Sequence, residues 1–114
     1  MTNNEYSHVA KTRMFKACLR SPDMSTRAAM LRLQKLARGA GKDCEHEEGM
    51  DEMLCVDVAR DIAKGIELWV DDWLWAIVVR SYLVENKPDC SFSMAQDLMI
   101  TDLADVVADG MWSK

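Results

Sequence analysis

Residues 66–85 read IELWVDDWLWAIVVRSYLVE and hold three of the four tryptophans in the chain. At 100° per residue, large apolar side chains fall on nearly every side of this stretch, and Trp69, Trp73 and Ile77 form one stripe at four-residue steps. A helix that is apolar all round is normally buried or spans a membrane. The unbroken apolar run covers only residues 73–79, whereas a membrane span needs about 20 apolar residues. We therefore expect a buried helix around which the other segments pack.

The composition of the whole chain is that of a folded helical protein. Of its 114 residues, 49% are hydrophobic and 29% are charged, which is typical of a globular rather than a disordered chain. Two prolines and five glycines leave few breaks, and no run of alternating β-branched residues predicts a strand. We predict an all-α fold in one domain over residues 1–114. Residues 1–4 form a loose N-terminus, and four or five helices form a compact bundle around the central Trp-rich helix.

Apolar residues at three- and four-residue steps define the other helices. We expect them over about 5–19, 25–38, 50–64 and from Ser93 onward, with Ser93 and Gln96 as a capping box. The residues that we expect to face the core are Ala29, Met30, Leu33, Leu36 and Ala37 on the second helix and Met99, Ile100, Leu103, Val106, Val107 and Met111 on the last. Pro22 and the Gly39-Ala40-Gly41 sequence should end the first two helices, and residues 39–49 should form a loop. Only Gly65 interrupts the apolar pattern between the third helix and the Trp-rich stretch. One long helix over 50–85 is therefore the alternative to two.

The net charge of −5 conceals a strong asymmetry along the chain. Residues 1–42 carry nine basic and two acidic residues, whereas residues 43–114 carry five basic and seventeen acidic residues. Such asymmetry indicates either a surface for a charged partner or two halves that pack against each other.

An acidic series on the last helix supports the first functional hypothesis. Asp102, Asp105 and Asp109 follow one another at three- and four-residue steps, on the side that we expect to face outward. Asp97, Glu47 and Glu48 add further carboxylates to this candidate protein-binding face. A face of this kind could imitate a phosphate backbone. We therefore predict a small regulatory or inhibitory protein that acts through protein–protein contacts, as an acidic nucleic-acid mimic of the phage type.

Basic helix faces in the first 42 residues support the alternative, nucleic-acid binding. The first two expected helices and the turn between them resemble the general layout of a helix-turn-helix. The candidate contacts to nucleic acid are Lys16 and Arg20 on the first helix and Arg27, Arg32, Lys35 and Arg38 on the second. Leu31 falls on the same basic side and is a candidate exposed contact. The sequence does not decide between the basic and the acidic face.

Self-association is the third hypothesis. The Trp-rich stretch carries a large aromatic surface for a bundle of this size. Opposite charges on the two halves of the chain would also steer two copies together and fix their register. We therefore expect a homodimer as one form of the protein.

Residues for catalysis or for metal binding are sparse. The two histidines, His8 and His46, lie beside no nucleophile motif, and no glycine-rich phosphate loop follows a strand. The four cysteines are well separated, whereas structural zinc sites usually take cysteines in closely spaced pairs. We predict a non-enzymatic protein without catalytic residues, without a metal site and without a cofactor.

The N-terminal sequence MTNNEYSHVAKTR lacks the apolar core of a signal peptide. Together with the absence of a membrane span in the sequence pattern, this feature predicts a cytoplasmic protein that does not bind to the membrane.

Overall fold

The computed structural model describes Met14 and residues 24–44, 52–86 and 88–112, and their regular elements are all helical. Helix α2 covers Met24–Asp43, α3 covers Glu52–Gly65 and the 3₁₀ helix η1 covers Ile66–Trp69. Helix α4 covers Asp72–Glu85, and α5 covers Phe92–Trp112. The prediction of a compact all-α bundle is confirmed.

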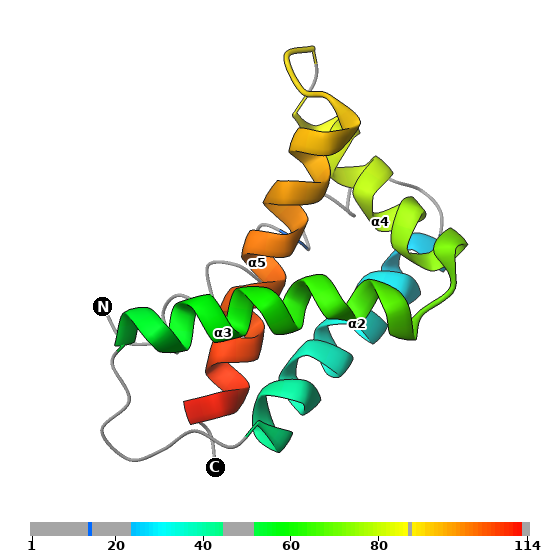
Figure 1. Ribbon diagram of the computed structural model, residues 1–114. Coiled ribbons are helices and arrows are strands. Elements are labelled where there is room, and N and C mark those ends of the chain that lie inside the picture. Colours follow the sequence, from blue (N-terminus) through cyan, green and yellow to red (C-terminus); the bar gives the residue numbers. More distant parts are fainter. Residues whose placement is uncertain (1–13, 15–23, 45–51, 87, 113–114) are drawn as a thin grey trace.

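Helix α5 packs most extensively against the other α-helices. It packs against α2, α3 and α4, and α2 also contacts α3 and α4. In Figure 1, α3 crosses α5, and a short turn joins α4 to the start of α5. The sequence predicted that the Trp-rich stretch would occupy the centre, but α5 occupies it instead. Helix α5 can do so because its buried apolar residues continue along most of its length: Ala95, Met99, Ile100, Leu103, Ala104, Val106, Val107 and Met111.

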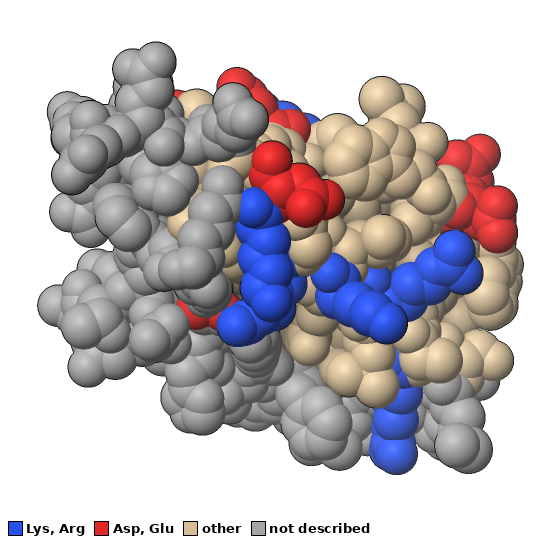
Figure 2. Space-filling model, turned by 90° about the horizontal axis from the view of Figure 1, so that it is seen from below, with Lys and Arg blue, Asp and Glu red and all other residues tan. Residues whose placement is uncertain are grey.

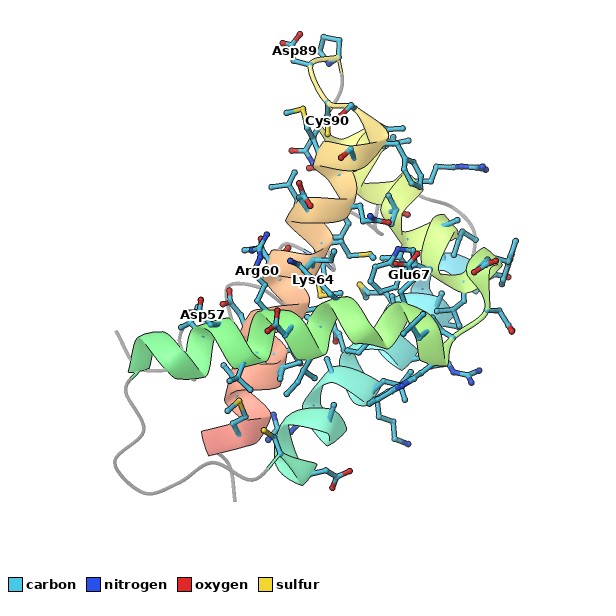
Figure 3. All side chains as sticks on the ribbon, viewed as in Figure 1. Asp57, Arg60, Lys64, Glu67, Asp89 and Cys90 are labelled. Carbon is cyan, nitrogen blue, oxygen red and sulfur yellow. The ribbon has the colours of Figure 1, made fainter. Side chains whose placement is uncertain are left out.

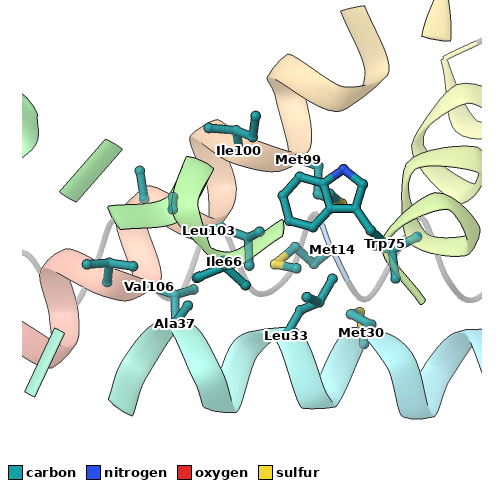
Figure 4. Close-up of a cluster of buried hydrophobic side chains, with 14 of the residues drawn as sticks. Met14, Met30, Leu33, Ala37, Ile66, Trp75, Met99, Ile100, Leu103 and Val106 are labelled. Carbon is teal, nitrogen blue, oxygen red and sulfur yellow. The ribbon is translucent and has the colours of Figure 1, made fainter. Parts of the chain in front are cut away.

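The core brings together apolar side chains from every described helix. Figure 4 shows side chains of α2, η1, α4 and α5 around Met14, which is fully buried. Trp75 is buried in this cluster, and its Nε1 donates a hydrogen bond to Oε1 of Gln96 at 2.9 Å. The predicted inward residues of the second helix that are confirmed as buried are Ala29, Met30, Leu33 and Ala37. Periodic apolar spacing therefore identified most of the core.

Two α-helices and a short 3₁₀ helix between them, rather than one helix, lie within residues 52–85, so the alternative of a long helix over 50–85 is wrong. The α-helix ends at Gly65, and η1 carries the chain to Trp69. Val70 and Asp71 then adopt extended backbone conformations before α4 begins at Asp72. Ile66, the first residue of η1, is buried in the core, whereas Trp69, its last residue, lies on the surface. An acidic pair at the start of α4 fits the positive end of a helix dipole.

Helix α2 is longer than the sequence predicted. It begins at Met24, one residue before the expected start, and runs through Gly39-Ala40-Gly41 to Asp43. The prediction that these glycines end the helix and open a loop is wrong for residues 39–43; residues 45–49 lie outside the described residues. Gly41 serves packing instead, because a Cβ there would overlap the carbonyl oxygen of Val107 on α5. Gly110 matches it, since a Cβ there would overlap the carbonyl oxygen of Arg38.

The start of α5 also differs from the predicted capping box. The hydroxyl oxygen of Ser91 accepts a hydrogen bond from the backbone N–H of Met94 at 3.2 Å. Ser91 is therefore the N-cap, two residues before the predicted one. Gln96 does not cap the helix with its side chain but accepts the hydrogen bond from Trp75.

Candidate functional site

The predicted acidic face of α5 is largely part of the protein interior. Asp102 and Asp109 are only 3% and 4% exposed. The hydroxyl of Tyr82 donates to Oδ2 of Asp102 at 2.6 Å, and Arg38 forms an ion pair with Oδ2 of Asp109. The prediction that these carboxylates face outward is wrong, because α5 is covered by α2, α3 and α4 and has no fully exposed side along this part.

The remaining acidic candidates do not restore a continuous face. Asp105 is half-buried, and Asp97 is exposed nearer the start of α5. Glu47 and Glu48 lie outside the described residues. Of the predicted acidic residues that the structure describes, only Asp97 is therefore fully available to a partner.

Three of the four basic candidates on α2 are exposed. Arg27, Arg32 and Lys35 are exposed, whereas Arg38 is only partly exposed and is paired with Asp109. Lys16 and Arg20 lie outside the described residues. The prediction that Leu31 is exposed on this side is confirmed. Figure 2 shows Lys and Arg side chains across the middle of one face of the molecule, with Asp and Glu side chains at its edges and also directly beside one of the basic side chains.

A groove runs beside this basic row. Its volume is about 690 Å³, which is in the range of ligand and peptide pockets. Arg32 and Lys35 line it from α2, and Ile62 of α3 and Trp69 of η1 line it as well. The other lining residues are Leu36, Gly39, Ala40, Asp43 and Cys44. The groove is thus mainly apolar, with two cations and one carboxylate in its lining. We call it the α2–η1 groove.

Two apolar residues near the groove residue Trp69 in the sequence, Leu68 and Trp73, are also largely exposed. Leu68 is 86% exposed, Trp69 is 63% exposed and Trp73 is 62% exposed. The sequence predicted that Trp69 and Trp73 face the core, and this prediction is wrong. Trp69 ends η1, where 3₁₀ spacing replaces the α-helical spacing that the prediction extended across Gly65. Trp73 follows Val70 and Asp71, whose extended backbone ends that helical phase altogether. The signal that could have revealed the turn is the Asp71-Asp72 pair in an apolar stretch.

The site holds one thiol. Cys44 lies in the groove at the end of α2, and its backbone N–H donates to the carbonyl oxygen of Ala40 at 3.1 Å. Cys44 and Cys90 are not disulfide-bonded. Within the described part of the chain, no three His, Cys, Asp or Glu residues come together in a way that could hold a metal ion.

Comparisons of the chain with protein-family models, with curated proteins and with solved structures found no match. Over the residues that the structure covers, no helix combines the length and the apolar character that crossing a membrane requires. The α2–η1 groove and the side chains around it are therefore the features that indicate a function.

Proposed function

We propose that the protein is a non-enzymatic regulatory or inhibitory module that binds a partner protein through the α2–η1 groove. One observation carries this proposal: Trp69 is largely exposed on the wall of a groove that Arg32 and Lys35 also line. Tryptophan and arginine are the residues that most often dominate the binding energy of protein interfaces. An exposed tryptophan beside an arginine therefore favours a contact surface.

The apolar lining of the groove favours a protein over a nucleic acid. Leu36, Ile62 and Trp69 can enclose an apolar side chain of a partner, as in helix-in-groove recognition. A phosphate backbone offers no such side chain, and Asp43 and the net charge of −5 would repel it. Arg38, one of the predicted phosphate contacts, is already paired with Asp109.

This proposal keeps the class of function that the sequence predicted but moves the working surface. The acidic series of α5 no longer offers a phosphate-like stripe, because Asp102 and Asp109 are buried. In place of that series, the exposed cations of α2 and the exposed tryptophans form the surface that contacts the partner. The thiol state of Cys44 and Cys90 suits the reducing cytoplasm, where we propose that the protein acts.

A comparative pull-down tests the proposal. The baits are the wild-type chain, Trp69→Ala, the Arg32→Glu/Lys35→Glu double variant and a control, Val84→Ala, all used in a lysate of the source cells. Val84 is also an exposed apolar residue but does not line the groove. We expect the wild type and the control to capture proteins that neither groove variant captures. The purified candidates should bind the wild type and Val84→Ala more tightly than they bind the two groove variants.

Two results would overturn the proposal. The first is a set of captured proteins that is the same for all four baits. The second is salt-sensitive binding of duplex DNA that the double variant abolishes and Trp69→Ala leaves unchanged, because that pattern belongs to phosphate contacts and would favour nucleic-acid binding.

A further inference from the structure

The start of α5 presents the chemistry that the α2–η1 groove would recognise. Phe92, Met94 and Leu98 are among the large apolar residues that stay exposed, and Asp97 is exposed beside them. No lysine or arginine occurs anywhere in Phe92–Trp112. The first turns of α5, residues 92–98, therefore present an exposed face that is both apolar and acidic.

We propose that the α2–η1 groove of one copy binds the start of α5 of a second copy. The inference rests on the groove being a protein-binding surface, as proposed above. Met94 and Leu98 are one helical turn apart and would enter the apolar part of the groove. Asp97, next to Leu98, would then lie toward Arg32 and Lys35, so that charge complementarity fixes the register.

The start of α5 is held in place before any partner arrives. Ser91 caps the helix, and Gln96 accepts a hydrogen bond from Trp75 in the core. Ala95 and Met99 are buried on the opposite side of the same turns. Binding therefore orders little of the backbone, which lowers the entropic cost of association.

The position of this face determines the kind of assembly. Figure 3 shows Asp89 and Cys90 at the tip of the α4–α5 turn, beyond the ends of α2 and α3. The groove residues lie instead in the second half of α2, near the end of α3 and in η1. The contact is therefore heterologous, and copies add head to tail unless a ring closes. This arrangement differs from a two-fold homodimer, in which the same patch would meet itself.

Sedimentation of the full-length chain over a concentration series tests the inference. The wild-type average mass should rise with concentration above that of one chain and should fall again as salt is added. The groove variant Arg32→Glu/Lys35→Glu and the α5 variant Met94→Gln/Asp97→Asn should each associate at least ~10-fold more weakly. All the substituted residues are exposed, and circular dichroism should show unchanged helix content.

Mixing the two variants gives the sharpest result. The groove variant keeps an intact α5 face, and the α5 variant keeps an intact groove. Their mixture contains one working pair of surfaces, so it should form a complex of two chains and nothing larger. Matched controls elsewhere on the surface, Arg80→Glu and Asp57→Lys, should associate like the wild type.

A wild-type mass equal to one chain at every concentration would overturn the inference. So would variants that associate like the wild type, or a mixture that stays monomeric. The outcome is separate from that of the pull-down: a monomeric chain that loses a captured partner on Trp69→Ala refutes self-association and leaves the proposed function standing.

Discussion

The hydroxyl of Tyr82 donates a hydrogen bond of 2.6 Å to the carboxylate of Asp102, which joins α4 to α5 in the interior. Both residues are buried, so the contact belongs to the core rather than to a surface. A hydroxyl that donates to a carboxylate forms one of the stronger hydrogen bonds in proteins. Asp102 therefore stabilises the fold and does not face a partner.

Removing the Tyr82 hydroxyl should destabilise the protein. In Tyr82→Phe, Asp102 loses this donor while it stays buried, and hydrogen bonds to charged groups contribute about 1.5–3 kcal/mol. We expect the free energy of unfolding in urea to fall by about that amount. The exposed Asp97 provides the control on the same helix, because Asp97→Asn should change the free energy by less than about 0.5 kcal/mol. Equal effects of the two substitutions would contradict the buried role of Asp102.

The glycine crossing of α2 and α5 makes a second prediction. Gly41→Ala and Gly110→Ala each place a Cβ against the backbone of the other helix, so each should lower the free energy of unfolding by about 1–3 kcal/mol. Gly39→Ala is the matched control, because a Cβ there meets nothing within 4 Å. This control should stabilise α2 by about 0.5–1 kcal/mol, since alanine favours a helix over glycine. Thermal or urea unfolding of the three variants measures both signs, and destabilisation by Gly39→Ala would count against the crossing.

The basic residues of α2 should separate into two groups by their effect on stability. Arg38→Met removes the ion-pair partner of the buried Asp109 and should lower the free energy of unfolding by about 1–2 kcal/mol, a reduced value because Arg38 is partly exposed. Arg32 is exposed and does not take part in that ion pair, so the free energy of unfolding of Arg32→Met should stay within about 0.5 kcal/mol of the wild-type value. Urea unfolding measures both variants. A large loss in Arg32→Met would show that the groove cations serve the fold rather than binding.

The tryptophans should differ in their access to solvent. Trp69→Phe and Trp73→Phe should each remove emission that acrylamide quenches efficiently, because both indoles are exposed. Trp75→Phe should remove emission that is blue-shifted and poorly quenched, because Trp75 is buried. Steady-state quenching of the three folded variants tests this order. Protection of Trp69 in the isolated monomer would contradict an open α2–η1 groove.

The sequence predicted the fold well where local periodicity determines burial. Leu33, Met99 and Val107 were expected in the core from their spacing, and all three are buried. Gly41 was read as a helix terminator, because a sequence does not reveal that a second helix passes close to it. Asp102 was assigned to the outer side, because the hydroxyl of Tyr82 reaches it only after α4 and α5 pack together.

The candidate site was predicted only in part. The exposed cations Arg32 and Lys35 followed from the amphipathic pattern of α2. Trp69 did not, because the α-helix ends at Gly65 and Trp69 lies in the 3₁₀ helix that follows, so the α-helical phase no longer sets the side that it faces. A groove formed by α2, α3 and η1 joins residues that lie up to 37 positions apart, and helical periodicity within one segment carries no information about such contacts.

The most direct test of the α2–η1 groove as the binding surface is site-specific photo-crosslinking in the source cells. A diazirine amino acid replaces Leu36 inside the groove, and in a second chain it replaces Val56, an exposed residue that does not line the groove. We predict that position 36 yields a crosslinked protein that position 56 does not, and that Trp69→Ala in the same chain removes this product. Equal products from both positions, or a product from position 36 that survives Trp69→Ala, would contradict the role of the groove.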